Sequence, residues 1–380
     1  MRILQSIVLP AILILSLPAL AQIPPVSGGM TRGAFSSARI EGRWGVKVWS
    51  NRLLDISPRE FGRCSAHPKH PVVVCGSADG YFRALHKDNG ELIWTFKTSA
   101  ALRAAPAFHG DQVILAAADG CLHTLDVRDG SAIWKKPYCV DNPIWGDPVV
   151  TPDIIYFSVL GNQVYAIGRE DGRLRFKVQR DRPQAMSSEG ISEPVIDGDV
   201  LYSAFSDGVL VASNRFNGRE LWHQDLTDDS NGPTDADSTP VVKDGVVFSG
   251  AFSAGPVALK ASDGTILWKG RRFGVDQPVI FGRLLIVADA EGFVTAFNRA
   301  DGTESWTTKL DTPAAWNPIL VEDMLVVGGD RGLWLLRPSD GKVLSRTALP
   351  FGVTTEPGVD RLDLYFPAPG GTVNKAALVR

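Results

Sequence analysis

The sequence has no excess of basic residues and few of the residue types that build redox or metal centres. Its 380 residues include 39 Lys+Arg against 42 Asp+Glu, so the formal net charge is −3. This balance argues against a generic nucleic-acid binder, which needs a basic surface to neutralise phosphates. There are 4 cysteines, none adjacent to another, and 6 histidines. No glycine-rich loop follows a strand and opens a helix, so a nucleotide site lacks its structural context.

Long apolar runs are also lacking after the first 20 residues. Residues 3–20 are almost wholly apolar, follow Met1-Arg2 and end at Ala19-Leu20-Ala21, a small-x-small pattern that signal peptidases recognise. We therefore expect a cleaved signal peptide over residues 1–21, a flexible leader over residues 22–40 and export to the periplasm. A membrane span is the alternative, since the length of the run is marginal. The first cysteine is Cys64, so we expect no lipid anchor after the cleavage point.

A block of eleven residues that ends in an aromatic side chain recurs along the rest of the chain. In all seven copies the seventh position is glycine, preceded by Asn or Asp. With glycine at 38 of 380 positions, this agreement has a chance probability of roughly 10⁻⁷. Asn-Gly and Asp-Gly between apolar segments predict tight hairpins, because the turn needs positive φ. The copies span residues 84–94, 124–134, 166–176, 212–222, 258–268, 296–306 and, in degenerate form, 335–345.

A second marker is a proline that opens a Val/Ile-rich strand, a position where no backbone donor is needed. Another turn and another strand lie between the two markers, so each unit contains four short strands. The prolines are Pro106, Pro148, Pro194, Pro240, Pro278, Pro318 and Pro357.

The two ends of the repeat region complement each other. After the last copy the chain supplies three strands, whereas the N-terminal side supplies a lone strand at about residues 46–50. Pairing them closes a ring and removes two sheet edges. We predict an all-β, eight-bladed β-propeller over residues 41–380, with a linear solenoid as the alternative. The aromatic side chains are expected to pack between blades rather than to stack on a ligand: Trp49, Trp94, Trp134, Phe176, Trp222, Trp268 and Trp306.

The eleven-residue block resembles the tryptophan-docking repeat of pyrroloquinoline-quinone (PQQ) propellers, which include cofactor-dependent dehydrogenases and cofactor-free scaffolds. The mature length, the closure by an N-terminal strand and the final Gly-Gly-Thr-Val strand are most similar to the BamB family, the eight-bladed periplasmic scaffolds of outer-membrane β-barrel assembly. The resemblance implies a scaffold that is no enzyme, holds no cofactor and binds a BamA-like insertase. It also implies contact with nascent outer-membrane proteins, by strand addition at a blade edge, and no nucleic acid or nucleotide.

One segment carries the resemblance to specific partner-binding residues. Residues 235–240 (Asp-Ala-Asp-Ser-Thr-Pro) resemble a family loop whose two carboxylates help to bind the insertase, which makes Asp235 and Asp237 candidates. A neighbouring family loop matches less well: Met186 keeps the apolar character, but Glu189 stands where the family has an arginine. Reversed charge weakens an interface unless the partner has changed too. The acidic segment could instead bind Ca²⁺ or be a solvated loop.

Two further functions stay open as alternatives: a PQQ-dependent oxidoreductase, and a propeller in another envelope complex. The enzymes of the PQQ family pair the quinone with Ca²⁺, often have adjacent cysteines, and carry long insertions over the active site; this chain has neither the cysteine pair nor the insertions. His67 and His70 have loose metal-ligand spacing, but no third ligand is evident, so we expect a turn and no metal.

The four cysteines suggest disulfides if the chain is exported. Four cysteines allow three connectivities. Cys64 and Cys75 flank one turn, and Cys121 and Cys139 flank an Asp-Gly hairpin. We predict these two pairs, each about two residues away from direct cross-strand opposition.

Overall fold

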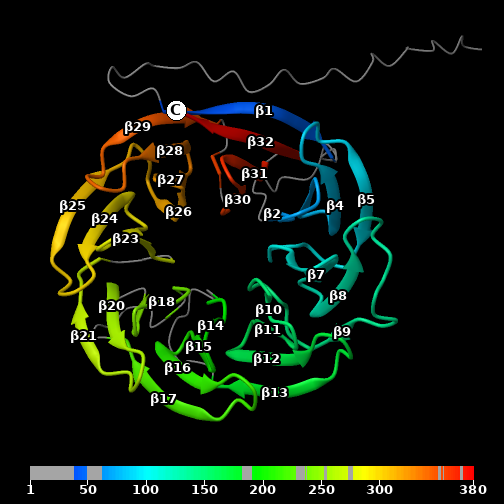
Figure 1. The fold of residues 1–380 in the computed structure, drawn as a ribbon, viewed down its shortest axis with the longest axis horizontal. Helices are drawn as coiled ribbons and strands as arrows, with labels where there is room; N and C mark the ends of the chain where they lie inside the picture. Colours follow the sequence, from blue (N-terminus) through cyan, green and yellow to red (C-terminus); the bar gives the residue numbers. More distant parts are fainter. Residues whose placement is uncertain are drawn as a thin grey trace, which may run out of the picture.

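The structure, a computed structural model, describes residues 38–48, 62–181, 191–227, 236, 238–251, 255–272, 277–349, 352–353, 355–368 and 371–380. Over these ranges the chain forms eight four-stranded antiparallel sheets and no helix. The sheets are arranged around a central axis like the blades of a propeller (Figure 1). The predicted fold class and blade number are therefore confirmed. No described segment is a helix that could cross a membrane.

Each blade runs from an inner strand at the axis to an outer strand at the rim, in chain order. The strands of the first four blades are β2 (Cys64–Ala66), β3 (Val72–Gly76), β4 (Tyr81–His86) and β5 (Leu92–Lys97) in blade 1; β6 (Ala107–His109), β7 (Gln112–Ala116), β8 (Cys121–Asp126) and β9 (Tyr138–Cys139) in blade 2; β10 (Val149–Val150), β11 (Ile154–Val159), β12 (Gln163–Gly168) and β13 (Leu174–Gln179) in blade 3; and β14 (Val195–Asp197), β15 (Val200–Ala204), β16 (Val209–Asn214) and β17 (Glu220–Asp225) in blade 4.

The next three blades repeat the same order. Their strands are β18 (Val241–Lys243), β19 (Val246–Ala251), β20 (Gly255–Lys260) and β21 (Ile266–Lys269) in blade 5; β22 (Val279–Phe281), β23 (Leu284–Ala288), β24 (Phe293–Asn298) and β25 (Glu304–Lys309) in blade 6; and β26 (Ala315–Val321), β27 (Met324–Gly329), β28 (Gly332–Leu336) and β29 (Val343–Ala348) in blade 7. Six of the seven marker prolines directly precede an inner strand as predicted; Pro318 instead lies within β26, at a register shift between Trp316 and Ile319.

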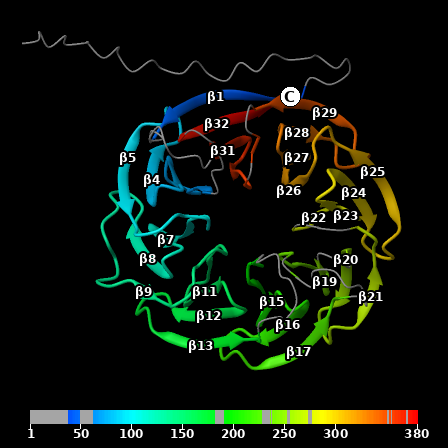
Figure 2. The same ribbon diagram turned by 180° about the vertical axis from the view of Figure 1, so that it is seen from behind.

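Blade 8 joins the two ends of the chain. Its inner strands are β30 (Gly358–Asp360), β31 (Asp363–Ala368) and β32 (Thr372–Val379), and its outer strand is β1 (Arg39–Lys47). β1 and β32 pair from Arg39↔Val379 to Lys47↔Thr372, and lie side by side in both views (Figures 1 and 2). The lone strand predicted at residues 46–50 therefore lies earlier in the chain and is longer, because it matches the length of β32. It begins at Arg39, two residues inside the predicted leader.

The aromatic end of each block packs against the hairpin of the next blade. The Trp94 Nε1 donates a hydrogen bond to the Val127 carbonyl of blade 2 at 2.8 Å. The ring lies on Gly130, whose φ is 73° and where an added Cβ would be 2.9 Å from the indole. Glycine is thus required at this position for two reasons: its positive φ and the close approach of the indole ring. The equivalent bonds run from Trp134 to Arg169 at 3.1 Å, Trp222 to Ala261 at 2.9 Å, Trp268 to Arg299 at 2.9 Å and Trp306 to Pro338 at 3.1 Å.

Phe176 has no N–H, and a neighbouring side chain takes over its hydrogen bond. The Tyr156 hydroxyl donates to the Arg215 carbonyl at 2.8 Å, the acceptor equivalent to Val127. The Phe176 ring still lies on the turn glycine, Gly218. At this junction two different side chains therefore supply the ring packing and the hydrogen bond to the backbone carbonyl, Phe176 the first and Tyr156 the second.

Trp44, which the sequence pattern missed, makes this contact between blades 8 and 1. Its Nε1 donates to the Lys87 carbonyl at 3.1 Å and its ring lies on Gly90. Trp49, predicted for this role, lies outside the described residues. The same closure explains why the seventh copy ends in Ser345 instead of an aromatic residue. Blade 8 takes its last two strands from opposite ends of the chain, so it has no Asp-Gly turn on which an indole could pack.

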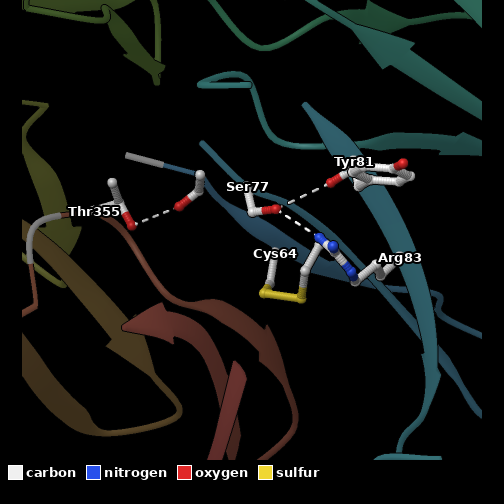
Figure 3. The surroundings of a disulfide bond; sticks show 7 residues. Cys64, Ser77, Tyr81, Arg83 and Thr355 are labelled. Carbon is white, nitrogen blue, oxygen red and sulfur yellow. Dashed lines mark hydrogen bonds between the residues drawn. A yellow bond between two sulfur atoms is a disulfide. The ribbon is translucent and has the colours of Figure 1, made fainter. Parts of the chain in front are cut away.

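Disulfides join both cysteine pairs (Figure 3 shows the first). Cys64 pairs with Cys75 at a Cα–Cα distance of 4.0 Å, and Cys121 with Cys139 at 4.1 Å. Both pairs lie in direct cross-strand opposition, so the predicted two-residue offset is wrong. In blade 2 the register of the repeat would place Thr124 opposite residue 134, and therefore Cys121 opposite residue 137. The outer strand is interrupted before Tyr138, and the short β9 pairs two positions further along the chain, which brings Cys139 opposite Cys121.

The first disulfide lies beside the contact between blades 1 and 8. The Thr355 hydroxyl donates to the Gly62 carbonyl at 3.0 Å, two residues before Cys64 (Figure 3). On the other side, Ser77 accepts a hydrogen bond from Arg83 at 2.7 Å. The disulfide thus fixes the inner hairpin of blade 1 where the last blade packs against it.

Candidate partner-binding site

The predicted partner-binding residues belong to two consecutive loops that enter blades 4 and 5. Met186, Glu189, Asp235 and Asp237 all lie outside the described residues, and their roles stay predictions. The described residues that flank them show where each loop is attached to the ring.

The second loop is attached through its described residues on both sides of Asp237. Ala236 is fully buried, and its N–H donates to the Phe205 carbonyl of blade 4 at 3.2 Å. Ser238 is also buried, and its carbonyl accepts a bond from the Ser249 hydroxyl of blade 5 at 3.3 Å. The backbone around the two candidate aspartates is therefore anchored at the junction of blades 4 and 5.

The two loops end beside each other. The N–H of Glu193, at the end of the first loop, donates to the Thr239 hydroxyl, at the end of the second, at 3.1 Å. Because both residues precede the inner strands β14 and β18, the loops share one end of the central channel. The sequence placed the candidate residues 46 or more positions apart along the chain, and this bond brings the ends of their loops together.

Glu193 also belongs to a charged cluster at the axis, which we call the hub cluster. It consists of Arg63, Asp147, Glu193 and Glu356, from blades 1, 3, 4 and 8. The Arg63 guanidinium lies 2.9 Å from an Asp147 oxygen and 2.8 Å from a Glu193 oxygen, and it also pairs with Glu356. Its side chain is 19% exposed. One cation from blade 1 thus holds three carboxylates that come from three other blades.

The sequence contains a signal for the hub cluster that the repeat pattern alone does not reveal. Asp147, Glu193 and Glu356 each stand directly before one of the strand-opening prolines. That position ends the loop from the preceding blade and leads into the inner strand, and in these three units its carboxylate reaches Arg63 at the axis. An acid before the marker proline in three units was the available indication.

Charge balance in the hub cluster alters the pKa values of its members. Burial raises the pKa of Asp147 well above its usual range; Arg63 opposes this, and the Glu193 and Glu356 carboxylates add to it. Burial alone would lower the pKa of Arg63, but the Asp147, Glu193 and Glu356 carboxylates outweigh it and raise that pKa. The Arg63 guanidinium is therefore a permanent counter-ion for the three carboxylates, which would repel one another without it.

The hub cluster does not fit a Ca²⁺–quinone centre. A Ca²⁺ site needs several oxygens directed at one point, whereas here the carboxylates are directed at a guanidinium. In the ranges that the structure describes, no three His, Cys, Asp or Glu side chains are grouped to hold a metal. Beside the cluster, Glu356 borders a cavity of about 230 Å³ whose walls include Val279, Ile319 and Val359.

His67 and His70 are turn residues. The Nε2 of the buried His67 is 2.7 Å from the Gly110 carbonyl, and its Nδ1 accepts the N–H groups of Lys69 and His70. Both ring nitrogens are thus used by the backbone, and burial lowers the pKa of His67. His70 pairs with Asp111 of blade 2 at 2.9 Å. These contacts connect the first hairpins of blades 1 and 2.

Comparison with known proteins assigns the family. A family model described as "Outer membrane protein assembly factor BamB" matches residues 39–139, 78–308 and 254–348. The chain belongs to this family. The BamB of Yersinia pestis is 33% identical over 82 residues, 20% of this chain and 21% of the relative, so the aligned part spans about a fifth of that protein.

Solved structures show how widely the fold is shared. BamB from Moraxella catarrhalis superposes with a TM-score of 0.75 at 17% identity, covering 89% of this chain and 100% of that one. The quinohemoprotein alcohol dehydrogenase from Comamonas testosteroni superposes with a TM-score of 0.69 at 12% identity, covering 89% and 76%. A propeller of this kind thus occurs both in an assembly factor and in an oxidoreductase, and the function has to be argued from the residues.

Proposed function

We propose that this chain is a non-enzymatic scaffold of outer-membrane β-barrel assembly that binds a BamA-like insertase. The family match over residues 39–348 carries the proposal. The insertase's periplasmic domains would contact the loops that hold Met186, Glu189, Asp235 and Asp237. Nascent barrel proteins would be presented beside them. In this setting the protein works in the periplasm, at the inner surface of the outer membrane, after removal of residues 1–21.

The geometry supports a docking role for these loops. Their ends are bonded to each other through Glu193 and Thr239, and Glu193 is held by Arg63 in the hub cluster. Rigid attachment lowers the entropy that a loop loses when it binds a partner. Two loops anchored at one place can therefore act as one surface.

Pull-down of the native protein tests the proposal. Recovery of the insertase by the unchanged chain, and a loss of about tenfold or more in D235A/D237A, is the expected result, since hydrogen-bonded interface carboxylates commonly contribute 2 kcal/mol or more. The matched control is D88A/E170A, which also removes two carboxylates; these side chains are 81% and 85% exposed on other blades.

Three outcomes would contradict the proposal. Recovery of other envelope proteins without an insertase would favour a different complex. A quinone absorbance band and dye reduction after addition of PQQ and Ca²⁺ would favour an oxidoreductase. Equal recovery by D235A/D237A and the control would remove the two aspartates from the interface.

A further inference from the structure

Three pairs of neighbouring blades are connected on the hairpin side by a similar bridge. In these pairs the residue three positions before the turn glycine extends its side chain to the preceding blade. The Lys87 ammonium lies 2.5 Å from Asp360 of blade 8, and the Arg299 guanidinium lies 3.2 Å from Asp244 of blade 5. Arg169 donates to Gln112 of blade 2 at 3.0 Å. We call this contact the interblade bridge.

The interblade bridge is not made between blades 6 and 7, nor at the junctions of blades 1 and 2 and of blades 4 and 5, where Val127 and Ala261 hold the bridging position. Pro338 holds the bridging position, as the hydrogen bond from Trp306 to its carbonyl shows. A proline side chain has no donor, so it cannot reach a polar group of blade 6. The first hairpin of blade 6 carries a cation, Arg283, whereas the first hairpins of blades 5 and 8 carry the bridging carboxylates Asp244 and Asp360.

A cavity of about 410 Å³ lies at this junction. Blades 6 and 7 lie side by side there (Figure 2). Its walls include Phe281 and Arg283 of the first hairpin of blade 6, Ser305 and Trp306 of β25, and Ser339 and Asp340 of blade 7. The volume falls within the range of about 300–1,000 Å³ that is typical of ligand pockets.

The chemistry of the walls is asymmetric. Phe281 and the indole of Trp306 supply apolar surface, and the two serines supply hydroxyl donors. Asp340 is already paired with Arg337 at 2.9 Å. In the part of the chain that the structure describes, the Arg283 guanidinium forms no ion pair. The group that would complement this cavity is therefore a carboxylate attached to an apolar body.

We propose that this cavity binds an acidic segment of a protein partner, with a carboxylate on Arg283 and an adjoining apolar side chain against Trp306 and Phe281. Between blades 8 and 1 and between blades 5 and 6, the corresponding contact is a side-chain ion pair made within the chain. Here the preceding blade supplies the cation Arg283, and Pro338 of the following blade has no side-chain group that could pair with it. A carboxylate from another protein would complete the bridge with its polarity reversed. The site is independent of the loops proposed to bind the insertase.

Peptide binding to the full chain tests the site. The probe is a fluorescein-labelled peptide with two Asp–Phe pairs, compared with the same peptide carrying Asn for Asp. We expect the Asp peptide to bind about tenfold or more tightly than the Asn peptide, and R283E to lose that preference. The matched control is R361E, which changes an exposed arginine in the first hairpin of blade 8. It should bind as the unchanged chain does.

A second variant and a local readout guard against indirect effects. R283D/P338R supplies the acid and the cation of a normal interblade bridge, so it should abolish peptide binding without lowering the melting temperature. With 5-fluorotryptophan, the ¹⁹F resonance that W306F removes should shift on adding the Asp peptide.

Four results would overturn the proposal: equal binding of the Asp and Asn peptides, equal binding by R283E and R361E, no binding of either peptide at about 1 mM, or no shift of the Trp306 resonance. If 3-phenylpropionate binds in an Arg283-dependent way and the peptides do not, the ligand is a small carboxylate and the protein segment is refuted.

Discussion

Replacing Arg63 with methionine should show how much of the ring's stability depends on the hub cluster. Methionine keeps the length and apolar part of the side chain but leaves Asp147, Glu193 and Glu356 without their shared counter-ion. Removing one partner from a buried ion pair typically costs 3–5 kcal/mol. Since these side chains are 19% to 29% exposed, we expect the lower end, about 3 kcal/mol. That corresponds to a fall of roughly 6 °C in the melting temperature.

The loss should depend on pH with a defined sign. The folded-state pKa of Asp147 is raised above its unfolded value of about 3.9. The folded state therefore binds more protons between those two values, and stability falls as the pH rises through that window. Arg63 limits the rise in the pKa of Asp147, so R63M extends the window upward. The variant should lose most at pH 8 and much less at pH 5.

Urea unfolding at pH 5 and pH 8, monitored by near-UV circular dichroism, measures the loss of unfolding free energy at each pH. R63M/D147N should recover part of the loss at pH 8, because it removes one uncompensated charge. The control R380M also separates an arginine from two carboxylates, Glu322 and Asp323, but that arginine is 58% exposed, so it should change stability by less than about 1 kcal/mol. If R63M and R380M are equally stable at pH 8, the hub cluster does not stabilise the ring.

Three other predictions concern how the blades are joined. G302A should cost about 2–3 kcal/mol, because its φ is 72° and an added Cβ would lie 2.7 Å from the Trp268 ring, whereas G282A, at φ 56° with open space, should cost only about 1 kcal/mol; equal melting temperatures would contradict this. W44A should lower the free energy of unfolding as much as a core aromatic deletion, by about 3–5 kcal/mol, because it loosens the closing strand; a change below about 1 kcal/mol would show that β1 is held by its backbone alone. Mass mapping of unreduced peptides should find the two disulfides and no free thiol, and removing either should cost about 2–4 kcal/mol.

The repeat made the fold predictable, and it also explains what was missed. Seven Asp-Gly or Asn-Gly turns at regular spacing define four-stranded units, and the unpaired ends require closure. The repeat does not set the position of the closing strand, because β1 is not joined to β32 by a turn and the repeat spacing does not apply to it. Spacing alone favoured Trp49, and the contact with Gly90 identifies Trp44.

The sequence did not predict the hub cluster or the cavity between blades 6 and 7, for a different reason. Arg63 and Glu193 are 130 residues apart, and Arg63 and Glu356 are 293 apart, so only ring closure brings them together. The cavity lies where Pro338 forms no interblade bridge, and this is visible only by comparison with Lys87, Arg169 and Arg299, which form one. Both features are departures from the repeat, which a search for agreement among copies passes over.

Two of the departures from the repeat, the hub cluster and the cavity between blades 6 and 7, lie beside the sites that we propose for partners. The positions that agree among blades (the turn glycine, the docking aromatic and the marker proline) all serve packing and ring closure, and they would be needed whatever the protein bound. Glu193 differs, because it joins the hub cluster through its side chain and the second loop through its N–H to Thr239. A movement of either loop therefore has to disturb a charged group at the axis. The scaffold proposed here is consequently rigid at the point where its candidate loops begin, and specificity is left to the residues beyond that point.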